Sequence, residues 1–253
     1  MLLIKNGKIV TMTGVNYEKG SILIKDGKIV EISENINEPQ GAAVIDAENK
    51  WVLPGLIDAH CHLGMLEEDI GFEGNDLNES TDPITPQLRG IDGINPFDPA
   101  FDEAVKAGIT TVMSGPGSAN VIGGQFAIIK TKGVSIDEMV ILEPAAVKIA
   151  FGENPKRIYK GKNKMPMTRM GTAALLRETL TKAVNYKNKK NAVLAKGDNF
   201  DIDIRMEALM PVLDRKIPLK AHAHRTDDML TAVRIAKEFD VLLTLDHCTE
   251  GHI

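Results

Sequence analysis

The most informative stretch of this chain is Trp51-Val52-Leu53-Pro54-Gly55-Leu56-Ile57-Asp58-Ala59-His60-Cys61-His62. Its apolar run from Gly55 to Ala59 predicts a short strand that ends at His60. Side chains two residues apart in a strand point to the same face, so the imidazoles of His60 and His62 can bind one ion. Imidazole suits Zn²⁺ and its first-row neighbours. The motif therefore predicts a metal site at the end of a strand.

Two residues inside this motif have less specific roles. Asp58 can orient a metal ligand or cap the turn after the strand, and the sequence leaves both open. Cys61 should face away from the two histidines and behave as a small buried apolar residue, and the same holds for Cys248.

The remaining histidines repeat this placement. His222 and His224 follow the predicted strand 217–221, and His247 follows the predicted strand 241–245. His252 lies just beyond, and no histidine falls in a predicted helix or in the first 50 residues. Two His-x-His pairs and a third strand-end histidine favour a metal site over structural or solvated histidines.

From Trp51 onward, short apolar strands alternate with longer helical stretches. Strands are predicted at 55–59, 109–113, 139–142, 146–150, 217–221 and 241–245, and helices at 98–107, 172–186, 202–214 and 227–239. This alternation implies parallel strands with crossover helices. We expect a (β/α) barrel, with a doubly wound open sheet as the alternative. In a barrel the carboxyl ends of the strands meet at one mouth, which would bring the histidines together.

The first 50 residues read as a separate all-β module. Asn6-Gly7 and Asp26-Gly27 are each flanked by apolar strand formers, which is a strong hairpin signal. We therefore expect two consecutive hairpins and a further strand at 43–47.

Three irregular segments interrupt the barrel pattern. Residues 63–99, rich in Gly, Asn, Asp and Pro, are either an active-site lid or a solvated insertion. Residues 115–124 are expected to form a flexible loop without phosphate-binding spacing. The basic stretch 156–164, which includes Arg157, could meet a substrate carboxylate or form a solvated loop.

Composition narrows the class of protein. The chain has 253 residues, is 43% apolar and carries a net charge of −5, which gives no indication of a nucleic-acid or anionic-membrane partner. No apolar run approaches the about 20 residues that span a bilayer. Two cysteines make no disulfide framework, so a reducing cytosol is the expected compartment.

These motifs carry a family resemblance. Residues 51–62 resemble the Pro-Gly-hydrophobic-Asp-x-His-x-His signature of the amidohydrolase superfamily. The opening hairpins, followed by Val44-Ile45-Asp46-Ala47, resemble the N-terminal part of its composite β-sandwich. Residues 104–112 resemble its next βα unit, and 220–224 and 246–248 resemble its later histidine strands. The resemblance covers nearly the whole chain and is closest to the branch that holds imidazolonepropionase and related Xaa-Pro dipeptidases.

The resemblance implies a (β/α)8 TIM-type barrel over residues 51–253, incomplete with about six strands, and an N-terminal β-sandwich module over residues 1–50. His60 and His62 would bind a first metal ion, with His222 as a further ligand. His247 would bind a second metal ion or contact the substrate. His224 would touch the substrate or support a ligand.

A bridging ligand is also implied, because binuclear members use a carboxylated lysine or a glutamate from the fourth strand. Lys148 is the candidate for this position and Glu143 is its rival. An ordinary buried lysine is the alternative interpretation of Lys148.

The implied activity is hydrolysis of a C–N bond in an amide, cyclic amide or dipeptide by a water that one or two Zn²⁺ ions activate. The general base, an Asp of the eighth strand, would lie beyond Ile253, and the family pattern does not support Glu250 in its place. The chain is thus expected to be a fragment, one half of a split enzyme or a truncated non-catalytic remnant. A metal-binding scaffold and a cyclic amidine deaminase are alternative functions. A small-molecule substrate is the expected partner, and a homo-oligomer or a complementing C-terminal fragment is compatible with the pattern.

Overall fold

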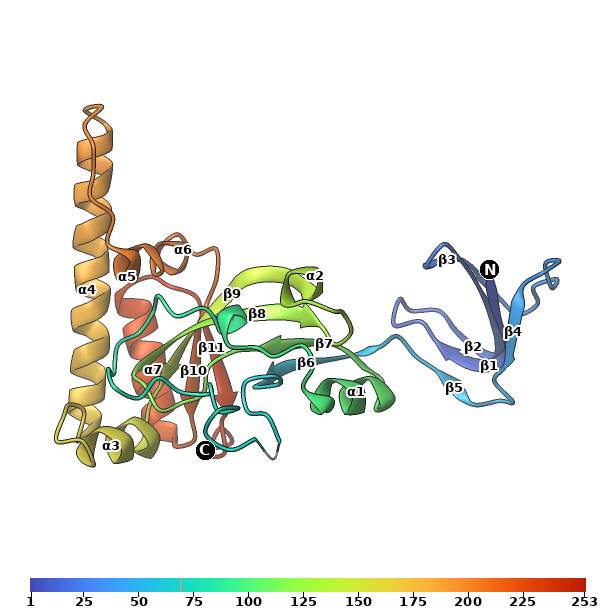
Figure 1. The fold of residues 1–253 in the computed structure, drawn as a ribbon, viewed down its shortest axis with the longest axis horizontal. Coiled ribbons are helices and arrows are strands. Elements are labelled where there is room, and N and C mark those ends of the chain that lie inside the picture. Colours follow the sequence, from blue (N-terminus) through green and yellow to red (C-terminus); the bar gives the residue numbers. More distant parts are fainter. Residues whose placement is uncertain (69) are drawn as a thin grey trace. The chain divides into compact units, whose positions relative to one another are not determined.

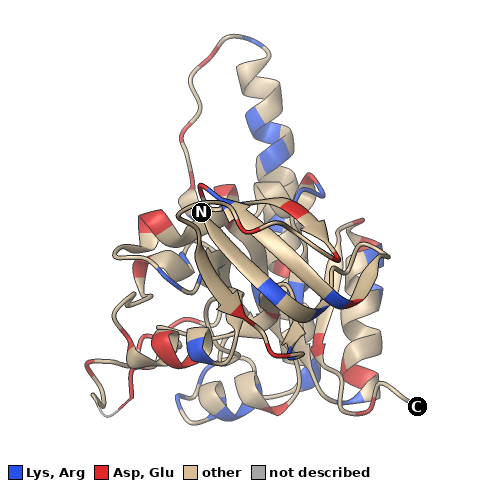
Figure 2. Cartoon of the chain, turned by 90° about the vertical axis from the view of Figure 1, so that its right-hand side faces the viewer, with Lys and Arg blue, Asp and Glu red and all other residues tan. Residues whose placement is uncertain are grey.

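The computed structural model describes residues 1–68 and 70–253, and it contains two compact units, Met1–Leu56 and Ile57–Ile253 (Figure 1). The predicted loop 63–99 includes Asp69, which lies outside the described residues. In the described part of the chain, no helix combines the length and the apolar character needed to cross a membrane. Lys and Arg segments are interspersed with Asp and Glu segments in Figure 2, in keeping with the small net charge of −5.

The first unit is one five-stranded sheet. Its strands are β1 (Leu2–Val10), β2 (Asn16–Lys25), β3 (Lys28–Ser33), β4 (Ala43–Asp46) and β5 (Trp51–Val52), in the order β3-β2-β1-β4 with β5 paired to β1. The β2–β3 hairpin is confirmed, because Asp26 and Gly27 both adopt the positive φ angles that its tight turn needs. The structure shows one sheet here, and the composite β-sandwich stays a prediction.

The hairpin predicted at Asn6-Gly7 is wrong. Strand β1 runs straight through both residues, and its pairing with β2 shifts register on either side of Gly7. Asn6 has a φ of 59°, and a Cβ on Gly7 would lie 2.6 Å from Cγ2 of Val52. The Asn-Gly pair therefore forms a bulge that lets β5 approach closely. The positive φ angle of Asn6 and the missing side chain of Gly7 serve this bulge and not a hairpin turn.

The second unit is an α/β fold around a six-stranded sheet in the order β11-β10-β9-β8-β7-β6. These strands are β6 (Leu56–Cys61), β7 (Ile109–Ser114), β8 (Ile122–Lys130), β9 (Val140–Ala150), β10 (Leu219–Ala223) and β11 (Leu243–His247). Strands β9, β10 and β11 are parallel neighbours, as predicted. A curved sheet of this kind is consistent with part of a barrel.

Strand β8 departs from the predicted pattern, because it runs antiparallel to both β7 and β9. Its first residues were predicted to belong to a flexible loop. Gly124 has a φ of 127°, and a Cβ there would lie 2.6 Å from the carbonyl oxygen of Leu88, so glycine is needed inside the strand. The two strands predicted at 139–142 and 146–150 are one continuous strand, β9.

The described residues also form helices in the connections between these strands. They are α1 (Pro99–Lys106), α2 (Ile136–Met139), α3 (Glu153–Lys160), α4 (Arg169–Leu194), α5 (Ile204–Glu207), α6 (Met210–Leu213) and α7 (Thr226–Glu238), with a 3₁₀ turn at Gly90–Asp92. Figure 1 shows α4 and α7 side by side next to β10. The helix predicted at 202–214 is split into α5 and α6, because Pro211 at the start of α6 cannot continue a helix.

The predicted helix 172–186 is longer in the structure, since the Thr168 hydroxyl caps α4 at its start. The stretch 156–164, predicted as a binding segment or a loop, instead forms much of α3.

Alternation along the strands divides apolar from polar side chains. In β9 and β10, the side chains of Val147, Ile149, Leu219 and Ala221 belong to the main apolar core, which also contains side chains of α4 and α7. The intervening residues must face the concave side of the sheet, because successive side chains of a strand point to opposite faces. Lys148, Lys220 and His222 occupy those intervening positions. The fold therefore collects charged and titratable groups on the concave side.

Candidate functional site

The predicted strand ends do carry the histidines. His60 lies in β6 with His62 directly after it, His222 lies in β10 with His224 directly after it, and His247 is the last residue of β11. His252 is exposed and lies apart from them in the C-terminal residues.

Five imidazole rings form one continuous cluster. The ring centroids of His60 and His62 are 5.2 Å apart, and those of His60 and His247 are 5.1 Å apart. His222 lies 4.7 Å from both His224 and His247. His60 on β6 and His247 on β11 belong to the two edge strands of the sheet. The two edges of the sheet therefore approach each other at these rings.

The backbone at His247 turns its side chain toward the other rings. His247 and Cys248 have φ angles of 70° and 47°, in the left-handed region that non-glycine residues rarely occupy. The Cys248 amide donates to the carbonyl oxygen of Ala223 and helps to hold this turn. Such strain often accompanies functional sites, and here it places His247 between His60 and His222.

The ring nitrogens differ in their hydrogen bonds. Nδ1 of His62 lies 2.7 Å from the carbonyl oxygen of Gly115, and Nδ1 of His224 lies 2.8 Å from the Thr249 hydroxyl. Nε2 of His222 lies 3.1 Å from Nδ2 of Asn154. Both ring nitrogens of His60 and Nδ1 of His222 are buried without a hydrogen bond. Nε2 of His60 and Nδ1 of His222 are thus free to bind a ligand, whereas Nδ1 of His60 lies 3.2 Å from the Asp246 carboxylate.

All four inner imidazoles are held neutral. Burial, aided by the charge of Lys148, lowers the pKa of His60 and of His222 from 6.5 to about 3. Burial also lowers the pKa of His62 and of His247. Neutral imidazole is the form that binds metal ions, so these rings need to release no proton at neutral pH.

These low pKa values predict an acid-sensitive fold. Between pH 6.5 and about 3 the unfolded chain binds protons at His60 and His222 that the folded chain does not bind. The free energy of unfolding should therefore fall as the pH decreases through this window. Urea unfolding at several pH values should show a shallower pH dependence for His60→Gln and His222→Gln than for the parent chain. An equal slope in all three proteins would contradict the prediction, and His252→Gln is the exposed control.

A buried ion cluster that the sequence interpretation missed lies beside these rings. Asp246 accepts hydrogen bonds from Lys220 at 2.7 Å and from Lys148 at 3.3 Å, and its Oδ2 lies 3.2 Å from Nδ1 of His60. Lys148, Lys220 and Asp246 are 0%, 4% and 7% exposed. Burial alone would raise the pKa of Asp246, but the Lys220 hydrogen bond and the Lys148 charge hold it below its usual value. Burial lowers the pKa of Lys148 to about 8.

Lys220 also joins the two edges of the sheet. Its ammonium donates to the carbonyl oxygen of Ala59 on β6, at 3.0 Å, as well as to Asp246 on β11. Strand alternation could have placed Lys220 on the face of His222, two residues later. Its pairing with Asp246 on another strand could not be predicted from the local pattern.

Four other predicted residues have local roles. The Asp58 carboxylate accepts from the amide of His60, so it caps its own strand. Glu143 pairs with Arg89 at 2.9 Å and does not contact the histidines in the described contacts. Glu250 accepts from the amide of Thr226 at the start of α7. Arg157 donates to Asn154. Cys61 and Cys248 were predicted to be buried, but both are only partly buried and pack at the margins of two apolar clusters.

The described residues do not form a ready-made metal site. No three His, Cys, Asp or Glu side chains within 1–68 and 70–253 converge closely enough to hold an ion as they stand. The residues nonetheless fit a metal ion in chemistry, because neutral imidazoles and unpaired buried nitrogens meet at one place. Binding would require small side-chain movements that bring these nitrogens together.

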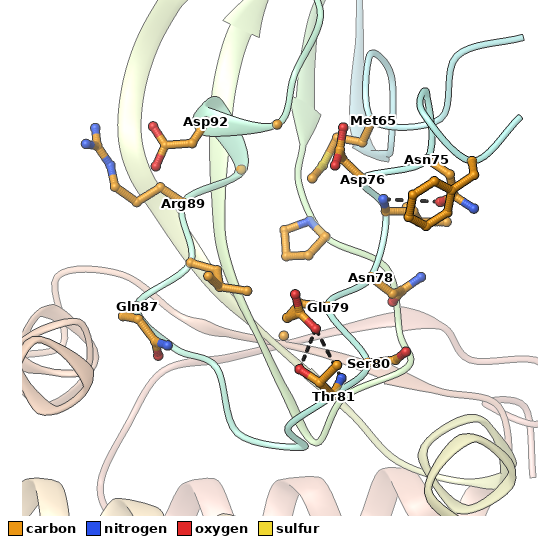
Figure 3. A pocket seen from close by; sticks show the side chains of 17 residues that line it. Met65, Asn75, Asp76, Asn78, Glu79, Ser80, Thr81, Gln87, Arg89 and Asp92 are labelled. Atoms are coloured by element: carbon orange, nitrogen blue, oxygen red, sulfur yellow. Dashed lines mark hydrogen bonds between the residues drawn. The ribbon is translucent and has the colours of Figure 1, made fainter. Parts of the chain in front are cut away.

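A cavity of about 590 Å³ adjoins the cluster (Figure 3). Segment 63–99 supplies most of its wall, with Arg89 and Asp92 on one side and Asn75 and Asp76 on the other. No histidine is among the described residues that line it. Two glycines connect it to the cluster: Gly123 lines the cavity and packs on Lys148, and Gly115 precedes the lining residue Pro116 and accepts from His62.

Hydrogen bonds hold this wall in place. Tyr159 donates to the carbonyl oxygen of Asp82, Lys164 donates to that of Thr81, and Arg205 pairs with the Asp82 carboxylate. The segment predicted as an active-site lid or a solvated insertion thus lines the cavity and is hydrogen-bonded to its neighbours at Thr81 and Asp82.

Comparison with known proteins extends these observations. No protein family model matches the chain. The chain is 29% identical over 259 residues to the amidohydrolase tasK of Hapsidospora irregularis. The matched region covers 92% of the chain and 26% of tasK. It is 25% identical over 281 residues to a dihydroorotase of Caldicellulosiruptor saccharolyticus, of which it spans 60%.

The crystal structure of an amidohydrolase from Thermotoga maritima MSB8 matches the whole chain with a TM-score of 0.95 and 44% identity. The chain covers 66% of that protein, so it spans only part of each of these relatives. Sequence relatives and this solved structure together support placing the chain in the amidohydrolase superfamily.

Proposed function

We propose that this chain forms the metal-binding part of a hydrolase that cleaves a C–N bond in an amide, cyclic amide or dipeptide. Relatives named as an amidohydrolase and a dihydroorotase support hydrolysis of such bonds. The observation that carries the proposal is the cluster of neutral imidazoles on the concave side of the sheet, in which His222 is buried and ring nitrogens of His60 and His222 have no hydrogen bond. The resemblance to the imidazolonepropionase and Xaa-Pro dipeptidase branch gives the substrate classes to test.

His60 and His62 would hold a first metal ion with His222 as a further ligand, and His247 would bind a second ion or contact the substrate. Lys148 would be the ligand that bridges two ions. Zn²⁺ is the expected ion because imidazole nitrogen is among its preferred ligands. When bound, the ion acts as a Lewis acid and lowers the pKa of a water molecule to about 7.

The chain's own residues prepare this site. The Gly115 carbonyl fixes the ring of His62 through Nδ1, which leaves Nε2 to face a ligand. Asp246 holds Lys148 and Lys220 in place, and burial lowers the pKa of Lys148 to about 8, which increases its neutral fraction. The adjoining cavity is the expected place for the rest of a small-molecule substrate, and His224 at the end of the cluster would contact it.

Zinc titration of the chelator-treated chain tests the metal part of this proposal. We expect Zn²⁺ to raise the free energy of unfolding by about 2.7 kcal/mol at a free concentration of about 100 times the dissociation constant. His62→Ala should weaken binding strongly, whereas His252→Ala, which changes an exposed histidine outside the cluster, should leave it unchanged. A folded chain that binds no zinc, or a His252→Ala variant as weak as His62→Ala, would overturn the assignment.

A substrate panel tests the reaction. The zinc-loaded protein is incubated with cyclic amides, N-acyl compounds and Xaa-Pro dipeptides, and the products are identified by mass spectrometry. Ring-opened or cleaved acids support the proposal. Release of ammonia from cyclic amidines would indicate a deaminase instead, and zinc binding without turnover of the panel would favour a metal-binding scaffold.

A further inference from the structure

Asn154 lies on the first turn of α3 and touches His222 directly. Its Nδ2 lies 3.1 Å from Nε2 of His222 and donates to the Ser118 hydroxyl at 2.9 Å. Its Oδ1 accepts from the guanidinium of Arg157 at 3.2 Å. His222 is 5% exposed, and its other nitrogen, Nδ1, is buried without a partner. The Asn154 amide is therefore the hydrogen-bond partner of one ring nitrogen of His222, and the other ring nitrogen has none.

The hydrogen bond decides which nitrogen can bind a metal ion. A neutral imidazole carries one proton, and the nitrogen that carries it cannot be a ligand. In the observed arrangement the Asn154 amide donates to Nε2, so the proton lies on Nδ1. If the amide rotates by about 180°, Oδ1 instead accepts a proton from Nε2, and Nδ1 becomes the free ligand nitrogen.

We propose that Asn154 is a positioning residue whose amide rotates to make Nδ1 of His222 the metal-binding nitrogen. This inference rests on the proposed metal-binding function. Both orientations of the amide are compatible with its neighbours on the buried side, because the Ser118 hydroxyl accepts in one and donates in the other. Arg157 can only donate, so it favours the orientation without metal. Arg157 is exposed, so its guanidinium can hydrogen-bond with solvent when the amide turns.

Three variants separate this mechanism from a purely structural role. Asn154→Leu keeps the size of the side chain and removes all three of its hydrogen bonds, and we expect about 10–100-fold weaker zinc binding. Asn154→Asp can only accept, so it holds His222 in the metal-binding form and should bind zinc at least as tightly as the parent. Arg157→Ala removes the residue that opposes rotation and should also bind at least as tightly. Equal affinities for Asn154→Leu and Asn154→Asp would overturn the inference.

Nitrogen-15 NMR of His222 supplies a readout that does not depend on zinc. In the metal-free parent the proton should lie on Nδ1, and in Asn154→Asp it should lie on Nε2. The same tautomer in both proteins would overturn the inference. Failure of the parent itself to bind zinc would refute the proposed function instead, so the two failures are distinguishable.

Discussion

Asp246→Ala is expected to lower the free energy of unfolding by about 3–5 kcal/mol, because it leaves buried charge without a partner. Asp246 is the one carboxylate that contacts both Lys148 and Lys220 among the described contacts, and all three side chains are nearly or fully buried. It also links β11 to His60 and, through Lys220, to the carbonyl oxygen of Ala59 on β6. Urea denaturation of the metal-free chain measures the loss.

The control for this variant is an exposed pair. Glu103 and Lys106 form a salt bridge on the surface of α1, and both side chains are about 70% exposed. Glu103→Ala should change the free energy of unfolding by no more than about 0.5 kcal/mol. Replacing all three buried charges, with Lys148→Met, Lys220→Met and Asp246→Leu together, should recover much of the stability lost in Asp246→Ala. A triple variant less stable than Asp246→Ala would show that unpaired charge is not the cause.

The sequence predicted those features of the site that depend on the pattern within a single strand. His60, His222 and His247 lie in the strands or at the strand ends where alternation and apolar runs placed them. This worked because a strand's faces follow from a period of two residues, which is a local property. The apolar pattern also predicted the strand at 146–150, and the family resemblance identified Lys148 on it as a site residue.

Contacts between strands could not be predicted in this way. Asp246 lies beside His222 in the parallel pairing of β10 and β11, and Lys148 lies beside Lys220 in that of β9 and β10. Register between distant strands depends on tertiary packing, so nothing in either segment alone joins these residues. Asn154 was missed for another reason: its stretch is polar and lysine-rich, and α3 is amphipathic mainly through Pro155 and Tyr159, which are buried.

The antiparallel strand β8 shows the same limit for the fold. The pattern of strands and helices predicted parallel neighbours throughout, yet β7, β8 and β9 follow one another without a crossover helix that covers the sheet. The start of β8 was predicted as a loop because it contains Gly123 and Gly124, and glycine is more typical of turns than of strands. Here they allow close approach to Leu88 and Lys148, which places this strand directly beneath the site.

Replacement of Phe126, in the middle of β8, is expected to have the second large effect. Its ring is fully buried and stacks on His60, with centroids 5.6 Å apart and an angle of 19° between the planes. The ammonium groups of Lys148 and Lys220 lie 5.5 Å and 5.7 Å from its centroid. A Cβ on Gly115 would lie 2.5 Å from the ring, so Phe126 also supports the residue that holds His62. Phe126→Ala should lower the free energy of unfolding by about 3–5 kcal/mol.

The effect of Phe126 on the site can be separated from its effect on stability. Leu180→Ala removes a fully buried side chain from α4 and should cost about 2–5 kcal/mol without changing zinc affinity. Phe126→Ala should weaken zinc binding as well, since His60 loses the ring against which it stacks and Gly115 loses its support. Both affinities are measured by competition with a chelator under conditions where each variant is folded. If Phe126→Ala loses stability and keeps the parent's zinc affinity, the ring fills the core and does not position the histidines.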